Sequence, residues 1–272
     1  MAKRKRLINS SWIERKLKEG RGKGHFSEYK PWLTIHDVPS KGVVTRVLGW
    51  KSGRLHHFLS EHYELAHFFQ MEWATNVLDI REQFPLLPIE KTMFIAEKLG
   101  VKHPTHPKTH QSVVMTTDML LTVKRGDEIH FQAHSIKPKS KISKRVLEKL
   151  EIERRFFEDE GISWRLVTER QIDRILVENV KWVHSAKTLL GMPHLNTDLV
   201  DGIEPYLYEA LQEKTKPCTD ITMCFDESSD LPPGTSMYIL RYLVANRRWE
   251  IDMKSVLTPS LTPVRVVRKI LE

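Results

Sequence analysis

An aspartate on one predicted strand and a lysine at the end of the next are the residue types that metal-dependent phosphodiester hydrolysis requires. Asp118 lies in an apolar, β-branched stretch at 113–123, and Lys137 ends an alternating stretch at 129–137. Residues 124–127 form a turn signal between the two stretches, so a hairpin is expected to bring Asp118 near Lys137. A carboxylate binds Mg²⁺, and a lysine can hold a water molecule or a phosphate. The hairpin therefore predicts part of a nuclease centre.

A second carboxylate, Glu64, lies upstream in a helix predicted to begin after Ser60 and to run to about Trp73. Glu64 flanks an apolar stripe at helical spacing, and this position allows its side chain to point inward. The stripe consists of Tyr63, Ala66, Phe69 and Trp73. A glutamate on a helix is more often a solvated residue or an ion-pair partner, so spacing alone leaves both interpretations open.

The composition indicates a globular, basic protein. The chain has 272 residues, of which 40% are hydrophobic, and a formal net charge of +8. This charge favours a polyanionic partner such as nucleic acid, because neutralising phosphates releases counterions. Positive charge is dense at 137–145, beside the proposed lysine, and at 3–6, which fits a solvated face or a nuclear import signal equally well.

The remaining sequence signals argue for a cytoplasmic protein with no membrane span. We expect neither a signal peptide nor a transmembrane helix, because the apolar runs are too short. Cys218 and Cys224 are too few for a disulfide framework or a four-thiolate zinc site. His103, His106 and His110 cluster in a loop, but with 13 histidines in the chain we interpret the cluster as chance rather than as a zinc site.

The glycine-rich stretch at 21–24 follows a predicted helix at 7–20 and could contact phosphate. It lacks the Gly-Lys-Ser/Thr ending of a nucleotide-binding P-loop, so we predict an ordinary mobile loop and no ATP binding.

The order of predicted elements indicates an α/β fold with a mixed sheet flanked by helices. A strand at 76–84 and a short helix at 89–99 precede the hairpin, and a helix at 143–160 and a strand at 163–167 follow it. Val146, Leu147, Leu150 and Phe157 are expected on the buried face of the long helix. From 168 the pattern becomes mostly helical, and its last helices and short strand suggest a winged helix. The predicted domains are therefore 1–167, catalytic, and 168–272, for partner or DNA binding.

Several motifs around these residues resemble the TnsA family, the endonuclease subunits of heteromeric transposases. The matching pieces are Glu19-Gly20-Arg21-Gly22, Pro31-Trp32-Leu33-Thr34, Val38-Pro39-Ser40, Gly53-Arg54-Leu55-His56-His57, Leu78-Asp79-Ile80-Arg81-Glu82-Gln83-Phe84-Pro85-Leu86, Thr117-Asp118, Lys137-Pro138 and Leu147-Glu148-Lys149-Leu150-Glu151. They cover most of residues 15–165 in the family's order. Beyond 168 the resemblance rests mainly on helix order.

The resemblance implies a restriction-endonuclease-like catalytic domain followed by a helical, winged-helix-like domain. The implied activity is cleavage at the 5′ ends of a transposon, while the partner transposase TnsB cuts and joins the 3′ ends and the ATPase TnsC regulates assembly. It also implies that Glu64, Asp118 and Lys137 form an active triad with Mg²⁺, or alternatively Mn²⁺. Asp118 would bridge the metals or anchor the principal one, Glu64 would bind or orient a second, and Lys137 would position the nucleophile.

Ser135 departs from the family pattern, which usually has glutamine at this position. Its hydroxyl could bind metal directly or through water, or the backbone carbonyl of Ile136 could do so instead. The serine could equally be a small residue fitted beside the site.

Two other functions remain open on the sequence. A free-standing restriction or repair nuclease would use the same active residues without a transposase partner. A non-catalytic assembly module would use its C-terminal helices to bind an ATPase or transposase, with Ser135 marking a decayed site.

Overall fold

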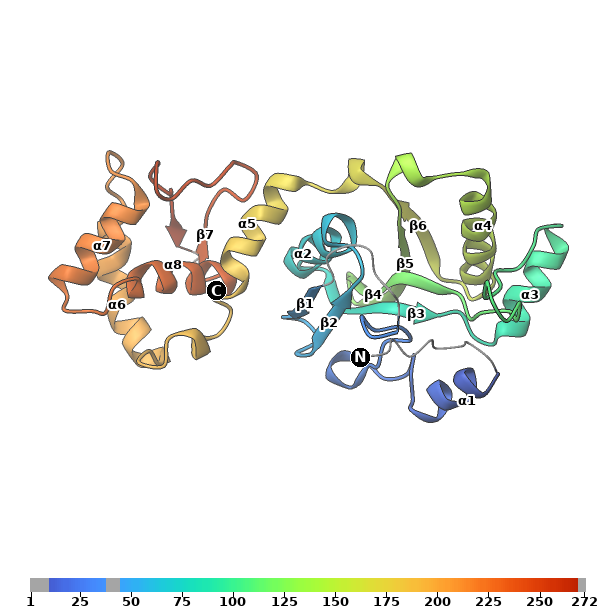
Figure 1. Ribbon diagram of the computed structural model, residues 1–272. Helices are drawn as coiled ribbons and strands as arrows, with labels where there is room; N and C mark the ends of the chain where they lie inside the picture. The colour runs from blue at the N-terminus through green and yellow to red at the C-terminus, as the bar shows by residue number, and fades with distance from the viewer. Residues whose placement is uncertain (1–9, 38–44, 269–272) are drawn as a thin grey trace. The chain divides into compact units, whose positions relative to one another are not determined.

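The computed structural model describes residues 10–37 and 45–268, and it divides the chain into two compact units (Figure 1). The first unit spans Met1–Ile172 and the second Asp173–Glu272. The division therefore falls after residue 172 rather than at the expected 167.

A four-stranded mixed sheet forms the centre of the first unit, as predicted. Its strand order is β3-β4-β5-β6, with bounds Val77–Pro85 for β3, Thr116–Arg125 for β4, Glu128–Ile136 for β5 and Ser163–Val167 for β6. Strands β3, β4 and β5 pair antiparallel, whereas β6 runs parallel to β5. Arg125 pairs with Glu128, so β4 and β5 are joined by a two-residue turn, in which Gly126 adopts a φ of 58°.

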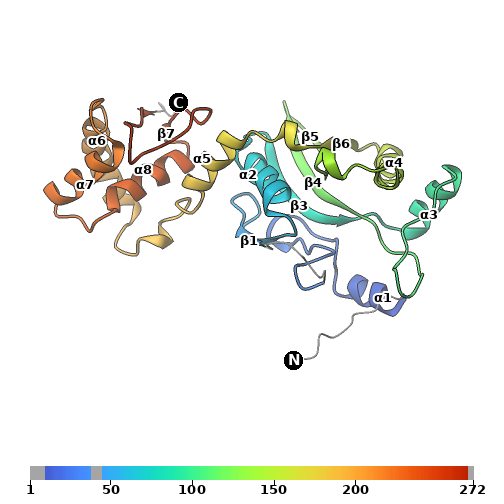
Figure 2. The same cartoon turned by 45° about the horizontal axis from the view of Figure 1, so that its top comes forward.

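Helices cover both faces of this sheet (Figures 1 and 2). The side chains of β5 alternate between the two faces, and their contacts show which helix covers which face. Ala133 packs in one apolar core with Ile152 and Phe156 of α4 (Lys144–Asp159), and α3 (Ile89–Lys98) contributes Ile95 to the same core. The next residue on the strand, His134, points the other way and contacts His67 of α2 (Ala66–Trp73).

The prediction for α4 needs one correction. Leu147 was expected on the buried face, but it is 52% exposed, whereas Leu150 and Phe157 are buried as expected. The reason is that the buried stripe of α4 centres on Ile152 and Phe156, which places Leu147 outside it.

The N-terminal part of the first unit contains α1 (Ser10–Lys18) and an antiparallel pair of strands, β1 (Thr45–Leu48) and β2 (Leu55–Phe58). The predicted helix from Ser60 to Trp73 is divided here. Residues Glu61–Leu65 form a π-helical turn, in which the Leu65 amide donates to the Ser60 carbonyl at 3.1 Å, and α2 continues from it. Ser60 makes no side-chain capping hydrogen bond, and Glu64 lies in the π-helical turn rather than in a regular α-helix.

The described part of the second unit contains four α-helices, a short 3-10 helix (Leu189–Gly191) and a two-stranded antiparallel ribbon. The helices are α5 (Arg174–His184), α6 (Thr197–Ala210), α7 (Cys218–Ser228) and α8 (Thr235–Ala245), and the ribbon pairs β7 (Trp249–Glu250) with β8 (Val267–Arg268). Helix α8 is the most buried of the four, since eight of its residues are buried. Among the described residues, no helix combines the length and apolar character needed to cross a bilayer.

Candidate active site

The β4–β5 hairpin brings Asp118 and Lys137 into direct contact. The Lys137 ammonium donates to Asp118 Oδ2 at 2.7 Å, and the Ile136 backbone amide donates to the same oxygen at 2.6 Å. The ammonium also donates to the Ile136 carbonyl at 2.9 Å. The Asp118 side chain is only 11% exposed, and that of Lys137 is 36% exposed, so the pair forms a polar centre that solvent reaches from the lysine side.

Glu64 completes a pair of carboxylates. The π-helical turn holds it, and its Oε2 accepts a hydrogen bond from the Leu59 amide at 3.1 Å. Burial, followed by the negative charge of Asp118, raises the pKa of Glu64 to about 7, and the positive charge of Lys137 opposes this rise. Two part-buried carboxylates that repel each other are typical of a cation-binding site.

Lys137 remains charged in this environment. Burial by itself would lower the pKa of its ammonium, but the charge and hydrogen bond of Asp118 outweigh burial, so the pKa lies above its ordinary value. Glu153 and Glu64 raise it further. Lys137 is therefore a fixed positive charge and hydrogen-bond donor beside the two carboxylates.

A third glutamate, Glu153 of α4, lies behind the pair and was not singled out in the sequence. It is buried, and its Oε1 accepts hydrogen bonds from the Ser135 hydroxyl at 2.5 Å and the Trp164 indole at 3.1 Å. Burial raises its pKa, and the charge of Asp118 contributes in the same direction. Helical spacing could have indicated it, because Glu153 lies one turn before the buried Phe157.

The Ser135 hydroxyl is directed toward Glu153, and the sequence offered no way to foresee this contact. Its proton is used in that buried hydrogen bond. The Ile136 carbonyl, in contrast, lies within the site, because it accepts from the same ammonium that contacts Asp118. Of the two alternatives for a further metal ligand, the geometry favours the backbone oxygen of Ile136.

The donor set fits a hard divalent cation. No described residue donates a hydrogen bond to Asp118 Oδ1 or Glu64 Oε1, so each carboxylate keeps an oxygen for another partner. Among the described residues, no group of three or more His, Cys, Asp or Glu side chains is arranged to hold a metal. Two carboxylates and a carbonyl, with water and substrate oxygens completing the shell, suit Mg²⁺ or Mn²⁺ better than zinc.

A buried histidine pair links the two halves of this site. His67 Nε2 and His134 Nδ1 lie 2.9 Å apart, connecting the helix that follows Glu64 to the strand that ends before Lys137. Burial lowers the pKa of His67 to about 3 and that of His134 to about 4, so both imidazoles are neutral. His67 Nδ1 and His134 Nε2 are buried and have no hydrogen-bond partner among the described residues.

Comparison with known proteins matches both units. Residues 74–169 match the family model described as TnsA-like endonuclease N terminal, and residues 171–253 match the model described as TnsA endonuclease C terminal. The chain is also similar to the transposon Tn7 transposition protein TnsA of Escherichia coli. The two are 40% identical over 248 residues, which cover 90% of this chain and 87% of that protein.

Proposed function

Because the chain belongs to the TnsA family of transposon endonucleases, we propose that Glu64, Asp118 and Lys137 form the centre at which it cuts DNA. The observation that carries this proposal is the contact of Lys137 with Asp118, with a second carboxylate close enough to be perturbed by both. The restriction-endonuclease-like fold of the first unit supplies the sheet that carries Asp118 on β4 and places Lys137 directly after β5.

Asp118, Glu64 and the Ile136 carbonyl would hold a divalent metal, which we propose to be Mg²⁺, with Mn²⁺ able to replace it. When bound, the metal would lower the pKa of a water molecule and offset charge on the scissile phosphate. Glu64 would have to lose its proton to serve as a ligand, because its pKa of about 7 leaves much of it protonated at neutral pH.

Lys137 would act on the substrate directly. Its ammonium would donate to a non-bridging phosphate oxygen or orient the attacking water, and in both cases its positive charge stabilises the charge that develops during hydrolysis. Asp118 holds this ammonium in place in the free protein. Glu153 would be a positioning residue, since it fixes Ser135 and thereby the end of β5.

The family relation extends the proposal to partners. We propose that the chain cleaves the 5′ ends of a transposon together with a TnsB-type transposase and a TnsC-type ATPase, in the cytoplasm of a bacterium. The second unit, predicted from residue 168 onward to be winged-helix-like, would bind a partner or DNA.

Asp118→Asn tests the site assignment. We expect nicking of transposon-end DNA in the reconstituted complex to fall at least ~100-fold, because a metal ligand and the anchor of Lys137 are lost together. Asp127→Asn is the matched control, since Asp127 lies in the exposed turn of the same hairpin. Partner and DNA binding should persist in both variants.

The same experiment separates the alternative functions. Vigorous cutting by the purified chain alone would favour a free-standing nuclease. A complex that still transposes normally with Asp118→Asn would show that the chain is a non-catalytic assembly module.

A further inference from the structure

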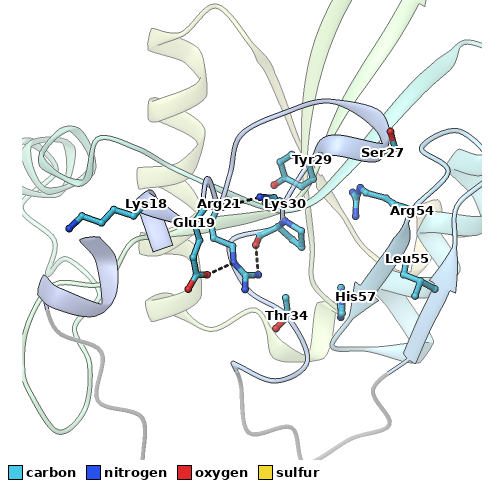
Figure 3. Close-up of a pocket in the computed structure, with 11 residues that line it drawn as sticks. Lys18, Glu19, Arg21, Ser27, Tyr29, Lys30, Thr34, Arg54, Leu55 and His57 are labelled. Carbon is cyan, nitrogen blue, oxygen red and sulfur yellow. Dashed lines mark hydrogen bonds and ion pairs between the residues drawn. The ribbon is translucent and has the colours of Figure 1, made fainter. Parts of the chain in front are cut away.

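A basic pocket of about 660 Å³ lies in the first unit, between the N-terminal segment and β2 (Figure 3). Among the described residues that line it, most of the charged ones are cationic and Glu19 alone is acidic. The basic residues that line it are Lys18, Arg21, Lys30, Arg54 and His57. Neither the metal site nor the catalytic centre uses any of them.

Arg54 is held rigidly at the inner side of this pocket. Its Nη1 donates to Glu82 Oε1 at 2.8 Å and its Nη2 donates to the Ile80 carbonyl at 3.0 Å, while the guanidinium carbon lies 4.9 Å from the centre of the Tyr29 ring. A guanidinium has five N–H donors, and this network does not use them all. Arg54 Nε is buried and has no hydrogen-bond partner among the described residues, although the Arg54 side chain is only 9% exposed.

His57, three positions further along, has a second unused polar atom. Its Nδ1 is buried and likewise has no partner in the part of the chain that the structure describes. Its backbone amide donates to Glu82, which holds the residue in place. A buried polar atom without a partner is costly, so two such atoms among the described residues that line one pocket indicate a ligand that would pair with them.

The pocket keeps net positive charge after its internal ion pairs are considered. Arg21 pairs with Glu19 at 3.1 Å and Arg54 with the buried Glu82, so these charges are offset. Within the described part of the chain, Lys30 donates only to the backbone carbonyl of Glu19, at 3.3 Å, and this contact leaves its charge intact. Lys18 is exposed at the rim. An anion is therefore the ligand that complements the pocket.

The pocket and the catalytic centre are connected through neighbouring elements of the first unit. Glu82, which anchors Arg54, pairs across the sheet with Met119, the residue after Asp118. Leu59 follows β2 directly, and its amide holds Glu64. The pocket and the catalytic centre are therefore linked through β3 and β4 and through the segment that follows β2.

We propose that this pocket binds a backbone phosphate of the DNA substrate, away from the phosphate that is cut. The inference rests on the proposed function, because it takes DNA as the substrate. The pocket fixes the position of the duplex, so that the scissile bond is presented to Asp118 and Lys137. Its contacts are to phosphate, so they contribute affinity without sequence preference.

The test is the affinity of the full-length chain for a fluorescently labelled DNA duplex of arbitrary sequence, measured by anisotropy without divalent metal over a series of salt concentrations. Lys30→Glu should weaken binding about 10-fold and reduce the slope of log affinity against log salt by about one. Lys149→Glu is the matched control, because it makes the same charge change at an exposed position of α4. It should change the affinity less than about 2-fold.

A second pair of variants probes the buried nitrogen. His57→Leu should weaken binding, whereas His57→Asn should retain it, because the asparagine amide nitrogen can occupy the place of Nδ1. Equal effects of Lys30→Glu and Lys149→Glu, or no measurable binding of the wild type at low salt, would overturn the proposal. If Lys30→Glu binds normally while Asp118→Asn abolishes nicking, the pocket assignment fails and the catalytic one stands. If Asp118→Asn nicks normally, the proposed function fails.

Discussion

The buried histidine pair makes the stability of the first unit depend on pH, and replacing both histidines by leucine should remove this dependence. His67 and His134 are 2% and 5% exposed, and each is neutral in the folded chain. In the unfolded chain both would titrate near the ordinary histidine pKa of about 6.5. The folded pKa values, about 3 and about 4, lie below this.

The direction of the effect follows from proton binding. Between about pH 6.5 and pH 4 the unfolded chain binds more protons than the folded chain, so acid favours unfolding. The contribution of the two histidines to the free energy of unfolding is fully present above about pH 6.5 and is lost as the pH falls toward their folded pKa values. At about 1.4 kcal/mol per pH unit for each histidine, a change from pH 6.5 to pH 5 costs about 2 kcal/mol per residue and about 4 kcal/mol for the pair.

The His67→Leu/His134→Leu variant should differ little from the wild type at pH 7.5, because replacing both partners of a buried hydrogen bond by apolar groups is nearly neutral. At pH 5 it should be more stable than the wild type by about 4 kcal/mol. Amide hydrogen exchange of β4 and β5 measures the free energy of opening of this unit specifically. His25→Leu is the control, since His25 is exposed.

An equal loss of stability in the double variant and the wild type between pH 7.5 and pH 5 would refute this reasoning. So would a titration of either imidazole near pH 6.5 in the folded protein, followed by NMR.

Three further predictions concern other groups. The apparent affinity of the metal-free chain for Mn²⁺, measured by calorimetry, should fall about 10-fold per pH unit below pH 7. The reason is that the Glu64 carboxyl, with its pKa of about 7, must lose a proton to bind the metal. An affinity that does not change with pH would show that Glu64 is not a metal ligand. Glu153→Gln should slow nicking about 10- to 100-fold and leave duplex binding unchanged, because it alters the hydrogen bond that holds Ser135 and not a contact with the substrate. Normal nicking by this variant would show that Glu153 contributes to packing alone. In the folded chain a thiol reagent should react with Cys224 and not with Cys218, which should react only after unfolding. Burial raises the pKa of the Cys218 thiol to about 11, whereas Cys224 is exposed. Rapid labelling of Cys218 in the folded chain would contradict the packing of α7.

The strand and hairpin patterns were sufficient to place Asp118 and Lys137 together. Alternation along 113–123 and 129–137 and the turn between them specify an antiparallel hairpin, and the contact at 2.7 Å follows from that register. The mixed α/β sheet was predictable for the same reason, since element type and order are local properties of the chain. Glu64 was different, because its position on the predicted helix was also compatible with a solvated residue. Only the resemblance to the TnsA family indicated a role in the active site.

Tertiary structure alone determined which helix side chains contact β5 on each of its two faces. Alternation shows that His134 and Ser135 point in opposite directions, but it does not say that α2 brings His67 to one and α4 brings Glu153 to the other. Tertiary structure also determined the π-helical turn that holds Glu64. It likewise buried one nitrogen of Arg54 and one of His57, for which the described residues offer no partner. A residue's face is determined by its neighbours in the chain, whereas its burial, its pKa and its partners depend on segments that fold against it from far away in the sequence.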